Sequence, residues 1–386
     1  MFGVTCMDFD LSQEQSMIVK MVREFAEGEI APKAAEVDRN ARFPVETFEK
    51  LGALGLLGLP ISEEYGGAGG DTISYALAVE EIGRACGSTG LSYAAHVSLG
   101  CGPINYFGTH EQKEKYLVPL ASGKELGAFG LTEPNAGSDA GGTQTRAVRD
   151  GDTYVINGSK AYITNAGYAK TIVVTAVVGK DERGKNRIGA FIVPTDSKGF
   201  SIVRTYEKMG LRGSNTTELS LEDVRIPAEN LLGSESEGFK QFLYTLDGGR
   251  ISIGALSVGI ARSAYEAALK YAKERVQFGQ SISKFQAIQF KLADMAMHIE
   301  LARDMVLKSA WLKDQHRPFT KESAMAKLFA SEICMRAADQ AVQIHGGAGY
   351  VQDFPVERIM RDAKLMEIGE GTSEVQRLVI ARQIGC

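Results

Sequence analysis

The chain has 386 residues, of which 44% are hydrophobic and 24% charged, and its formal net charge is -5. This length exceeds the roughly 250–300 residues at which one hydrophobic core stops growing, so we expect two or three domains. The acidic balance argues against a nucleic-acid-binding protein, which normally carries a basic face. Five scattered cysteines without a CxxC pair predict neither a disulfide framework nor a zinc site.

The first residues contain no targeting signal of a familiar kind. Met1 to Cys6 lack the basic and apolar regions of a secretory signal, and no stretch approaches 18 uninterrupted apolar residues. We therefore expect a cytoplasmic protein without a membrane span. Met7 reads as a second start, so residues 1–6 are interpreted as an upstream extension.

Three compositional regimes follow one another and set the expected domain borders. Residues 1–125 show helical periodicity broken by Gly and Pro, residues 126–235 change to a period of two with more β-branched residues, and residues 236–386 return to long helical runs. This order predicts an α+β protein with an N-terminal helical domain, a middle antiparallel β-barrel domain and a C-terminal four-helix bundle.

Turn signals divide the middle region into strands. Asp150-Gly151 and Asn157-Gly158 are hairpin pairs, so residues 144–149, 153–156 and 159–164 are predicted to form three sequential antiparallel strands. Residues 171–178 and 188–193 supply further strands. In the last region the helical period predicts long helices over 239–274, 284–315 and 321–345.

Two polar segments of the middle region are candidates for ligand binding. Leu131 to Asp139 reads as a strand that ends in Pro and Gly and exposes hydroxyls and backbone N–H groups, a surface suited to carbonyl and phosphate groups of a ligand. An ordinary polar turn is the alternative. Tyr162 and Thr164 lie two residues apart on a predicted strand and so share a face, where one can stack while the other donates.

Two helix ends of the last region carry a similar signal. Arg275 follows a long helix, where its guanidinium could pair with phosphate in a bidentate way; the alternative is a solvated arginine beside Lys273 and Glu274. Gln343 to Gly347 ends in paired glycines that permit close backbone approach. The histidine within it, His345, is interpreted as structural.

Near the C-terminus, Glu370 stands between Gly369 and Gly371, ahead of an amphipathic helix whose start is read from Ser373 and Gln376 as a capping-box pair. Glycine on both sides lets the backbone approach a ligand without a Cβ in the way. For this segment alone, an exposed loop glutamate is the ordinary interpretation. The rest of the chain favours a catalytic base.

Five motifs in this order resemble those of the flavin-dependent acyl-CoA dehydrogenases, over essentially the whole chain. They are Leu131-Thr132-Glu133-Pro134-Asn135-Ala136-Gly137-Ser138-Asp139, Tyr162-Ile163-Thr164-Asn165, Arg275-Val276-Gln277-Phe278-Gly279, Gln343-Ile344-His345-Gly346-Gly347 and Glu370-Gly371-Thr372. Each alone is weak, but five at the family's spacing are very specific.

The resemblance implies FAD as the cofactor, an acyl-CoA substrate and Glu370 as the base. The implied FAD contacts are Phe129, Leu131, Thr132, Gly137, Ser138, Tyr162, Ile163, Thr164, Arg275, Phe278, Gln286, Gln343, Ile344, Gly346, Gly347, Thr372 and Glu374. Those from Arg275, Gln286 and Gln343 to Gly347 would reach a neighbouring subunit's FAD, which implies a homotetramer. The implied substrate contacts are Ser138, Asp247, Arg250 and Gly371.

Gly249 points to a type within the family. Relatives of the isovaleryl and long-chain types place their base at this position, whereas this chain has glycine there and glutamate at 370. It therefore resembles the short- and medium-chain type, most closely the butyryl-CoA enzymes. Two positions depart from the family pattern: Tyr162 replaces the usual tryptophan, and Gly369 replaces a frequent tyrosine, which would enlarge the acyl pocket.

The implied reaction is α,β-dehydrogenation of a short- or medium-chain acyl-CoA to trans-2-enoyl-CoA in fatty acid β-oxidation. Glu370 would remove the α-proton, flavin N5 would accept the β-hydride, and an electron-transfer flavoprotein would take the electrons. An acyl-CoA oxidase is an alternative, although such chains usually carry a further C-terminal domain. A non-enzymatic binding protein on this fold should have lost Glu370 or the FAD loop.

Overall fold

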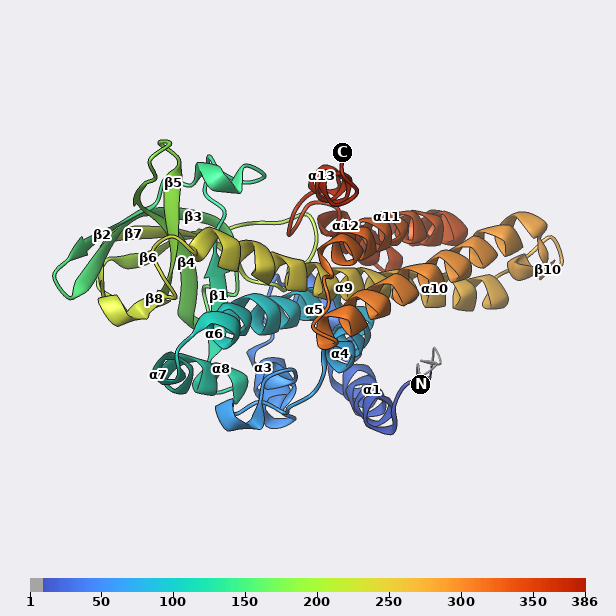
Figure 1. Cartoon of the computed structure of the whole chain (residues 1–386). Coiled ribbons are helices and arrows are strands. Elements are labelled where there is room, and N and C mark those ends of the chain that lie inside the picture. Colours follow the sequence, from blue (N-terminus) through green and yellow to red (C-terminus); the bar gives the residue numbers. More distant parts are fainter. Residues whose placement is uncertain (1–9) are drawn as a thin grey trace, which may run out of the picture.

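The computed structural model describes residues 10–386, so the expectation for residues 1–6 lies outside the described part. Helices come first, a β-sheet follows, and long helices complete the chain (Figure 1). The sheet lies at one end of an elongated molecule; the long helix α9 (Gly238–Glu274) runs from it to the opposite tip, where α10 (Gln286–Asp314) and α11 (Thr320–His345) lie alongside it (Figure 1). The expected three-part α+β fold is confirmed.

Short helices joined by tight turns make up the first part. Polar side chains cap several of them: Ser12 and Gln15 form a capping box on the first, and Asp71 accepts from the backbone N–H of Ser74 on the fourth. The helices are α1 (Gln13–Phe25), α2 (Ala34–Arg39), α3 (Val45–Ala53), α4 (Thr72–Ala85), α5 (Gly87–Ala94), α6 (Gly102–Phe107), α7 (His110–Gln112) and α8 (Val118–Ala121).

Eight strands form one sheet, with hydrogen-bonded neighbours in the order β6-β7-β3-β2-β4-β5-β8 and with β1 beside β4. Most pairs are antiparallel as expected, but β1 and β2 both pair with β4 in parallel, because the chain crosses over between them. The strands are β1 (Leu126–Gly130), β2 (Arg146–Asp150), β3 (Thr153–Thr164), β4 (Ala169–Lys180), β5 (Asn186–Pro194), β6 (Phe200–Thr205), β7 (Thr216–Pro227) and β8 (Leu231–Leu232).

One predicted hairpin is wrong. Asp150-Gly151 does turn the chain between β2 and β3, but Asn157-Gly158 lies inside β3, which runs unbroken to Thr164. Gly158 has φ 154° and sits where the β3–β7 register shifts, so it makes a bulge and not a turn. A Cβ there would also lie 2.4 Å from Thr145 Oγ1, so the site has no room for the side chain of any other amino acid.

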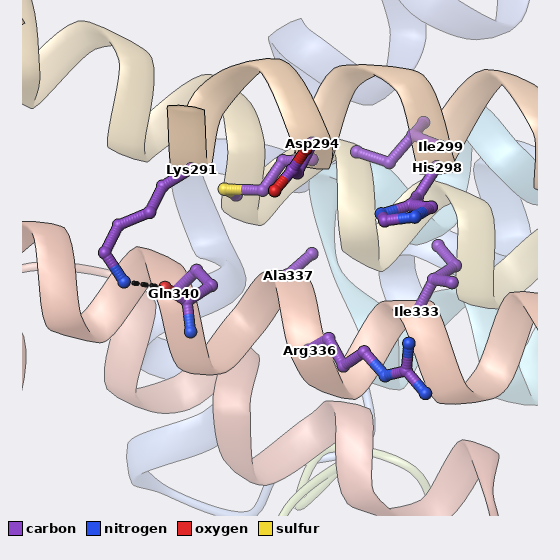
Figure 2. A pocket seen from close by; sticks show the side chains of 9 residues that line it. Lys291, Asp294, His298, Ile299, Ile333, Arg336, Ala337 and Gln340 are labelled. Atoms are coloured by element: carbon purple, nitrogen blue, oxygen red, sulfur yellow. Dashed lines mark hydrogen bonds between the residues drawn. The ribbon is translucent and has the colours of Figure 1, made fainter. Parts of the chain in front are cut away.

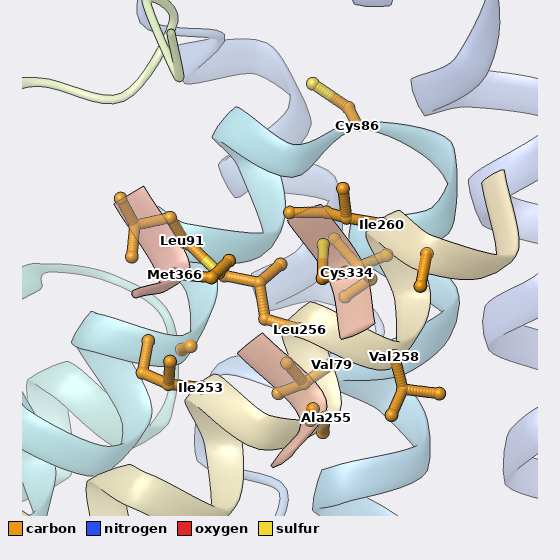
Figure 3. Close-up of a cluster of buried hydrophobic side chains, with 14 of the residues drawn as sticks. Val79, Cys86, Leu91, Ile253, Ala255, Leu256, Val258, Ile260, Cys334 and Met366 are labelled. Atoms are coloured by element: carbon orange, nitrogen blue, oxygen red, sulfur yellow. The ribbon is translucent and has the colours of Figure 1, made fainter. Parts of the chain in front are cut away.

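The long helices of the last part agree with the periodicity to within two residues at each end. They are α9 (Gly238–Glu274), α10 (Gln286–Asp314) and α11 (Thr320–His345), followed by α12 (Val356–Met366) and α13 (Ser373–Gln383); a small hairpin of β9 (Val276–Gln277) and β10 (Gln280–Ser281) joins the first two. The helix α9 is central: Ile253, Leu256 and Ile260 are buried against Val79 of α4 and Cys334 of α11 (Figure 3).

The start of α13 differs from the expectation. Thr372, not Ser373, is the N-cap and accepts from the backbone N–H of Val375. Gln376 turns back to the preceding loop, where its amide donates to the carbonyl oxygens of Glu370 and Gly371 at 3.1 and 3.0 Å. The predicted capping box is therefore wrong, because this side chain finds carbonyl acceptors in the loop itself.

Among residues 10–386, none of the helices has both the length and the apolar character needed to cross a lipid bilayer.

Candidate active site

Glu370 lies in the loop between α12 and α13, and its carboxylate reaches the backbone of α9. A Cβ placed on Gly249 would lie 2.0 Å from Glu370 Oε2 and 3.4 Å from Leu99 Cδ2. The glycine therefore leaves the space that the carboxylate fills. Glu370 itself has φ 51° and Gly371 φ 93°, so the loop holds Glu370 in a backbone conformation that few residues other than glycine adopt.

The carboxylate is poised to gain or lose a proton near neutral pH. Its Oε2 is buried, and no hydrogen-bond partner for it occurs among the described residues. Burial raises the pKa of Glu370 to about 7, although the positive charges of Lys327 and Arg250 act in the opposite direction. A carboxylate of this pKa is a much stronger base than one in water.

Arg250 and Asp247, two expected substrate contacts, lie one turn apart on α9 and form an ion pair with each other. Arg250 is only 4% exposed, and its Nε is buried without a partner in the described chain. Thr320 of α11 donates to Asp247 Oδ2 at 2.6 Å. The pair is therefore a fixed polar group beside the base, with donor capacity left for a ligand.

Sequence reasoning missed two residues that hold the base loop. Lys327 of α11 is fully buried and its Nζ donates to the carbonyl oxygen of Gly371 at 2.8 Å. Gln376 donates to the same carbonyl. A signal for Lys327 was present in the sequence, because it shares one helical face with Ser323, Ala330 and Cys334, all buried. A lysine in such a stripe is rare unless it has a partner.

The loop Leu131–Asp139 follows β1 and is anchored from below. Lys160 of β3, with no exposed surface, donates to the carbonyl oxygen of Leu131 at 3.1 Å and pairs with Glu133 at 2.7 Å. Beyond this anchor, Gly137 and Ser138 are exposed, and a Cβ on Gly137 would meet nothing within 4 Å. Phe129 is stacked on Phe242 of α9, 4.8 Å between ring centroids.

Tyr162 presents an aromatic face next to this loop. Its side chain is 63% exposed, its φ is 59°, and its ring is stacked on Tyr206 with 4.8 Å between centroids. Thr164 is half-buried, whereas Ile163 is buried in the sheet core. Only the backbone of Ile163 is therefore free to contact a ligand. The register of β3 against β7 shifts between Lys160 and Ile163, so simple strand alternation does not establish a shared face for Tyr162 and Thr164.

The other expected FAD contacts lie at the far tip of the molecule. Phe278 is 94% exposed in the β9–β10 hairpin, with Arg275 and Gln286 exposed on either side of it, and this hairpin is at the end opposite the sheet (Figure 1). Gly346 and Gly347 have open space around them, but Ile344 is buried. Tyr271 stacks on His345 at 4.3 Å, which supports the structural interpretation of that histidine.

Each cluster fits one part of a flavin dinucleotide. Exposed aromatic rings at Tyr162 and Phe278 can stack on flat heterocycles, and bare glycine backbone with a nearby arginine suits phosphate. One chain does not bring the two clusters together. Of the remaining expected contacts, Thr372 caps α13 and Glu374 is exposed in its first turn, both beside the base.

A cavity of about 210 Å³ lies elsewhere, between α10 and α11. Met295, Ile299 and Ile333 give it an apolar floor, and Lys291 bonds Gln340 across its edge (Figure 2). It contains none of the expected site residues, so it is separate from the candidate active site.

Known proteins match this chain over nearly its full length. Models of the acyl-CoA dehydrogenase N-terminal, middle and C-terminal domains match residues 12–124, 128–224 and 236–385. The probable acyl-CoA dehydrogenase YngJ of Bacillus subtilis is 69% identical over 98% of this chain and 100% of that protein.

This chain belongs to the acyl-CoA dehydrogenase family. The short-chain-specific acyl-CoA dehydrogenase of Clostridium acetobutylicum is 53% identical, over 98% of this chain and 100% of that protein. The butyryl-CoA dehydrogenase of Megasphaera elsdenii has a solved structure that matches with a TM-score of 0.96 at 47% identity, covering 98% of this chain and 100% of that chain. The chain is an acyl-CoA dehydrogenase close to the short-chain members, as the motifs indicated.

Two further solved structures, one with FAD and one from a study of an electron transferring flavoprotein, are similar to this acyl-CoA dehydrogenase. A relative from Bacillus anthracis, complexed with FAD, is 37% identical with a TM-score of 0.91, covering 97% of this chain and 67% of that chain. A chain from a structural study of the electron transferring flavoprotein of Acidaminococcus fermentans is 49% identical with a TM-score of 0.95. The match covers 98% of this chain and 100% of that chain.

Proposed function

We propose that this acyl-CoA dehydrogenase converts a short- or medium-chain acyl-CoA to the trans-2-enoyl-CoA, with Glu370 as the base and FAD as the cofactor. One observation carries the assignment: the buried carboxylate of Glu370, with an unpartnered Oε2, occupies the space that Gly249 leaves open on α9. In the proposed reaction, this carboxylate has only to accept the α-proton of the substrate.

The reaction needs a base strong enough to remove a weakly acidic α-proton. Burial gives Glu370 a pKa of about 7, which is closer to the pKa of the thioester α-proton than that of an exposed carboxylate is. About half of the Glu370 side chains stay ionised at neutral pH. The α-proton passes to the Glu370 carboxylate, and the C–H electron pair forms the new double bond as the β-hydrogen leaves. When bound, FAD accepts that hydrogen with its electron pair at N5.

Negative charge develops on the thioester oxygen as the proton leaves, and the base loop offers a donor for it. Within the described chain, the backbone N–H of Glu370 donates to no protein acceptor. A thioester carbonyl that accepts from this N–H would place its α-carbon beside the carboxylate of the same residue. Because the N–H is fixed by the loop, this stabilisation costs little reorganisation.

Most expected FAD contacts fall into a loop cluster, from Phe129 to Thr164, and a tip cluster of Arg275, Phe278, Gln286 and Gln343 to Gly347, and we assign the tip cluster to a neighbouring subunit's cofactor. Apolar side chains on the outer face of α10 support an assembly: Phe290, Met297 and Leu301 are 63%, 52% and 53% exposed and lie at helical spacing. A homotetramer built as a dimer of dimers would cover them. Electrons would then pass to an electron-transfer flavoprotein in the cytoplasm.

The test of the base is Glu370→Gln, which keeps the size of the side chain but cannot accept the proton. We expect kcat with butyryl-CoA to fall by at least about 10²–10⁴-fold, the range for removal of a general base. FAD content and binding of the unreactive product should stay at the wild-type level. Rapid bleaching of the flavin absorbance by butyryl-CoA in this variant would remove Glu370 from its role.

Substrate length is a separate question, and Gly369 bears on it. A Cβ on Gly369 would be 3.6 Å from Leu365 O, an ordinary contact, so a larger side chain can be tested there. We expect butyryl- to hexanoyl-CoA to give the highest kcat/KM, with some tolerance of a methyl branch. Gly369→Tyr should lower the ratio of isobutyryl- to butyryl-CoA turnover, by no more than the roughly 1–3 kcal/mol that one methyl group is worth. A preference for palmitoyl-CoA would contradict this reading.

A further inference from the structure

A buried lysine lies beneath the loop that carries the base. Lys327 belongs to the middle of α11, has no exposed surface, and donates from Nζ to the Gly371 carbonyl oxygen at 2.8 Å. Burying an ammonium group is costly unless it is paired and hydrogen-bonded. This lysine therefore needs negative charge nearby, and the loop provides it.

Gln376 makes a matching contact without a charge. Its Nε2 donates to the carbonyl oxygens of Glu370 and Gly371 from the first turn of α13. Together, Lys327 and Gln376 hold both carbonyls of a loop whose two central residues have positive φ. Such a backbone persists only when its surroundings fix it. Both residues thus restrain the backbone, and they differ in charge.

Three groups face the Glu370 carboxylate from the packed helices: Lys327 from α11, Arg250 from α9 and Tyr75 from α4. The charge of Arg250 is largely offset by its ion pair with Asp247. Tyr75 is buried, and its hydroxyl donates to the Ala94 carbonyl oxygen at 3.0 Å. Lys327 forms no ion pair within 4 Å in the described chain, and the carboxylates whose charge acts on it are Glu370, Glu367 and Glu374.

We propose that Lys327 is the positioning residue of the catalytic base: its hydrogen bond to the Gly371 carbonyl oxygen fixes the loop, and its positive charge favours the carboxylate form of Glu370. This inference rests on the proposed role of Glu370. Burial lowers the pKa of Lys327 to about 8, so the side chain is still mostly charged at pH 7. A positive charge near a carboxylate favours the ionised form and hence the form that accepts the α-proton.

The experiment compares Lys327→Met, Lys327→Arg and Gln376→Met in the purified FAD-containing enzyme, using kcat/KM for butyryl-CoA from pH 5.5 to 9.5. The acid limb of this profile reports the pKa of the base in the free enzyme. Removing the positive charge raises that pKa, so we expect the limb of Lys327→Met to move to higher pH by about one unit or more. Near pH 6 this shift alone gives a loss of about tenfold.

The other variants separate the charge from the hydrogen bond. Lys327→Arg keeps a positive charge and a hydrogen-bond donor. The acid limb of its profile should therefore lie within about 0.3 pH units of the wild-type limb, a much smaller shift than that expected when the charge is removed. Gln376→Met loosens the loop without changing a charge, so it should lower kcat/KM at every pH and leave the limb in place. If Lys327→Met does not fold, Lys327→Gln is neutral and still polar, and the same upward shift is expected.

A neutral variant at 327 with the wild-type acid limb would overturn the inference, as would a limb shift of equal size in Gln376→Met. The role of Glu370 is tested independently, since Glu370→Gln should be inactive at every pH. If Glu370→Gln is inactive but the acid limb of Lys327→Met is not shifted, the proposed role of Lys327 is wrong and the role of Glu370 stands. An active Glu370→Gln rejects both.

Discussion

At the scale of single residues, the position of Glu370 depends on the absence of a side chain at Gly249. The two residues are far apart in sequence, yet a Cβ on the glycine would lie 2.0 Å from the Glu370 carboxylate. The side chain of Glu370 and a side chain at position 249 of α9 would therefore occupy the same place. A carboxylate carried at either position would reach this place, so one of the two is enough.

Gly249→Ala should displace the base while leaving the fold intact. The new methyl group would overlap the carboxylate, which must swing away from the substrate, and a misplacement of about 1 Å can cost about 10²-fold in rate. We expect kcat/KM for butyryl-CoA to fall at least about tenfold.

The adjacent Gly248 provides the matched control for that substitution. A Cβ on Gly248 would be 3.3 Å from Lys313 Nζ, the end of a flexible side chain that can adjust. Gly248→Ala should therefore keep activity within about twofold and gain up to about 1 kcal/mol of helix stability. Equal activity in the two alanine variants would show that the carboxylate does not lie against Gly249.

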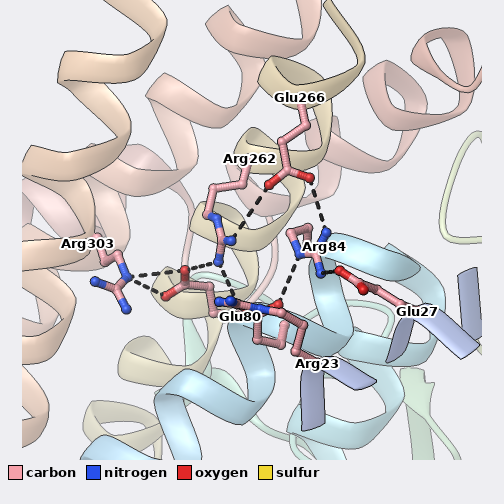
Figure 4. Close-up of polar contacts among 8 residues, drawn as sticks. Arg23, Glu27, Glu80, Arg84, Arg262, Glu266 and Arg303 are labelled. Atoms are coloured by element: carbon pink, nitrogen blue, oxygen red, sulfur yellow. Dashed lines mark hydrogen bonds and ion pairs between the residues drawn. The ribbon is translucent and has the colours of Figure 1, made fainter. Parts of the chain in front are cut away.

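At the scale of helices, α1, α4, α9 and α10 are joined by a network in which two buried carboxylates pair with partly exposed arginines (Figure 4). Glu81 of α4 is 2% exposed and pairs with Arg23, Arg84 and Arg262 at 2.9, 3.0 and 2.9 Å. The adjacent Glu80 pairs with Arg262 and Arg303. The network fixes the N-terminal helices against α9, and thus the wall that faces the base.

Glu81→Gln should destabilise the protein strongly, because it leaves three arginine side chains without their shared carboxylate. Breaking a buried ion pair costs roughly 3–5 kcal/mol, which should appear as a lower midpoint of urea unfolding at pH 7. Glu27→Gln is the control: Glu27 pairs with Arg84 at 2.7 Å but is 58% exposed, so its loss should cost less than about 1 kcal/mol.

The effect of Glu81 should also depend on pH in a defined direction. Burial alone would raise the pKa of Glu81, but the neighbouring arginines outweigh it and lower the pKa from 4.5 to about 2. The stabilisation is therefore complete above about pH 4.5 and is lost as the pH falls towards 2. The difference between wild type and Glu81→Gln should shrink over that range. A constant difference down to pH 2 would show that charge is not its cause.

Periodicity predicted the long helices well because their pattern repeats over many turns, whereas local features were less predictable. Asn157-Gly158 has the composition of a hairpin turn but forms a bulge, because β3 continues along β7. Gln376 has the spacing of a capping box but binds the loop carbonyls. The partner of Asn157-Gly158 is a strand distant in sequence, whereas the partners of Gln376 are only five and six residues away but are set by the fold of the loop.

The candidate site shows the same division between residue type and partner. Glu370 is proposed as the base only because five motifs occur together, since its glycine-flanked segment alone reads as an exposed loop; the direction of its pKa shift follows from burial. Lys327 could not be connected to it, because the contact joins α11 to a loop 44 residues further along the chain. Tertiary contacts of this kind require coordinates, even when the family is evident from motifs.

At the scale of the whole molecule, the two clusters of expected FAD contacts are separated by the length of α9. This helix has 37 residues, so it spans roughly 55 Å. It begins against β5, where a Cβ on Gly238 would be 2.6 Å from Ala190 N, and it ends at Arg275. One dinucleotide cannot reach both ends. The tip cluster can therefore bind FAD, as we propose, only if another subunit brings its own cofactor there.

Arg275→Ala should therefore weaken FAD binding through the assembly, although Arg275 is remote from the loop cluster of its own chain. We expect the wild type to be a tetramer by light scattering and the variant to lose FAD on desalting, seen as a lower ratio of absorbance at 450 nm to that at 280 nm. Losing a charged, bidentate phosphate contact should cost about 1.5–3 kcal/mol, or roughly 10–150-fold in the dissociation constant. Lys273→Ala, an exposed lysine in the last turn of the same helix, removes the same charge two residues away and should keep the cofactor. If the wild type is a monomer that retains FAD, or if both variants lose it equally, the tip cluster does not bind a neighbour's cofactor.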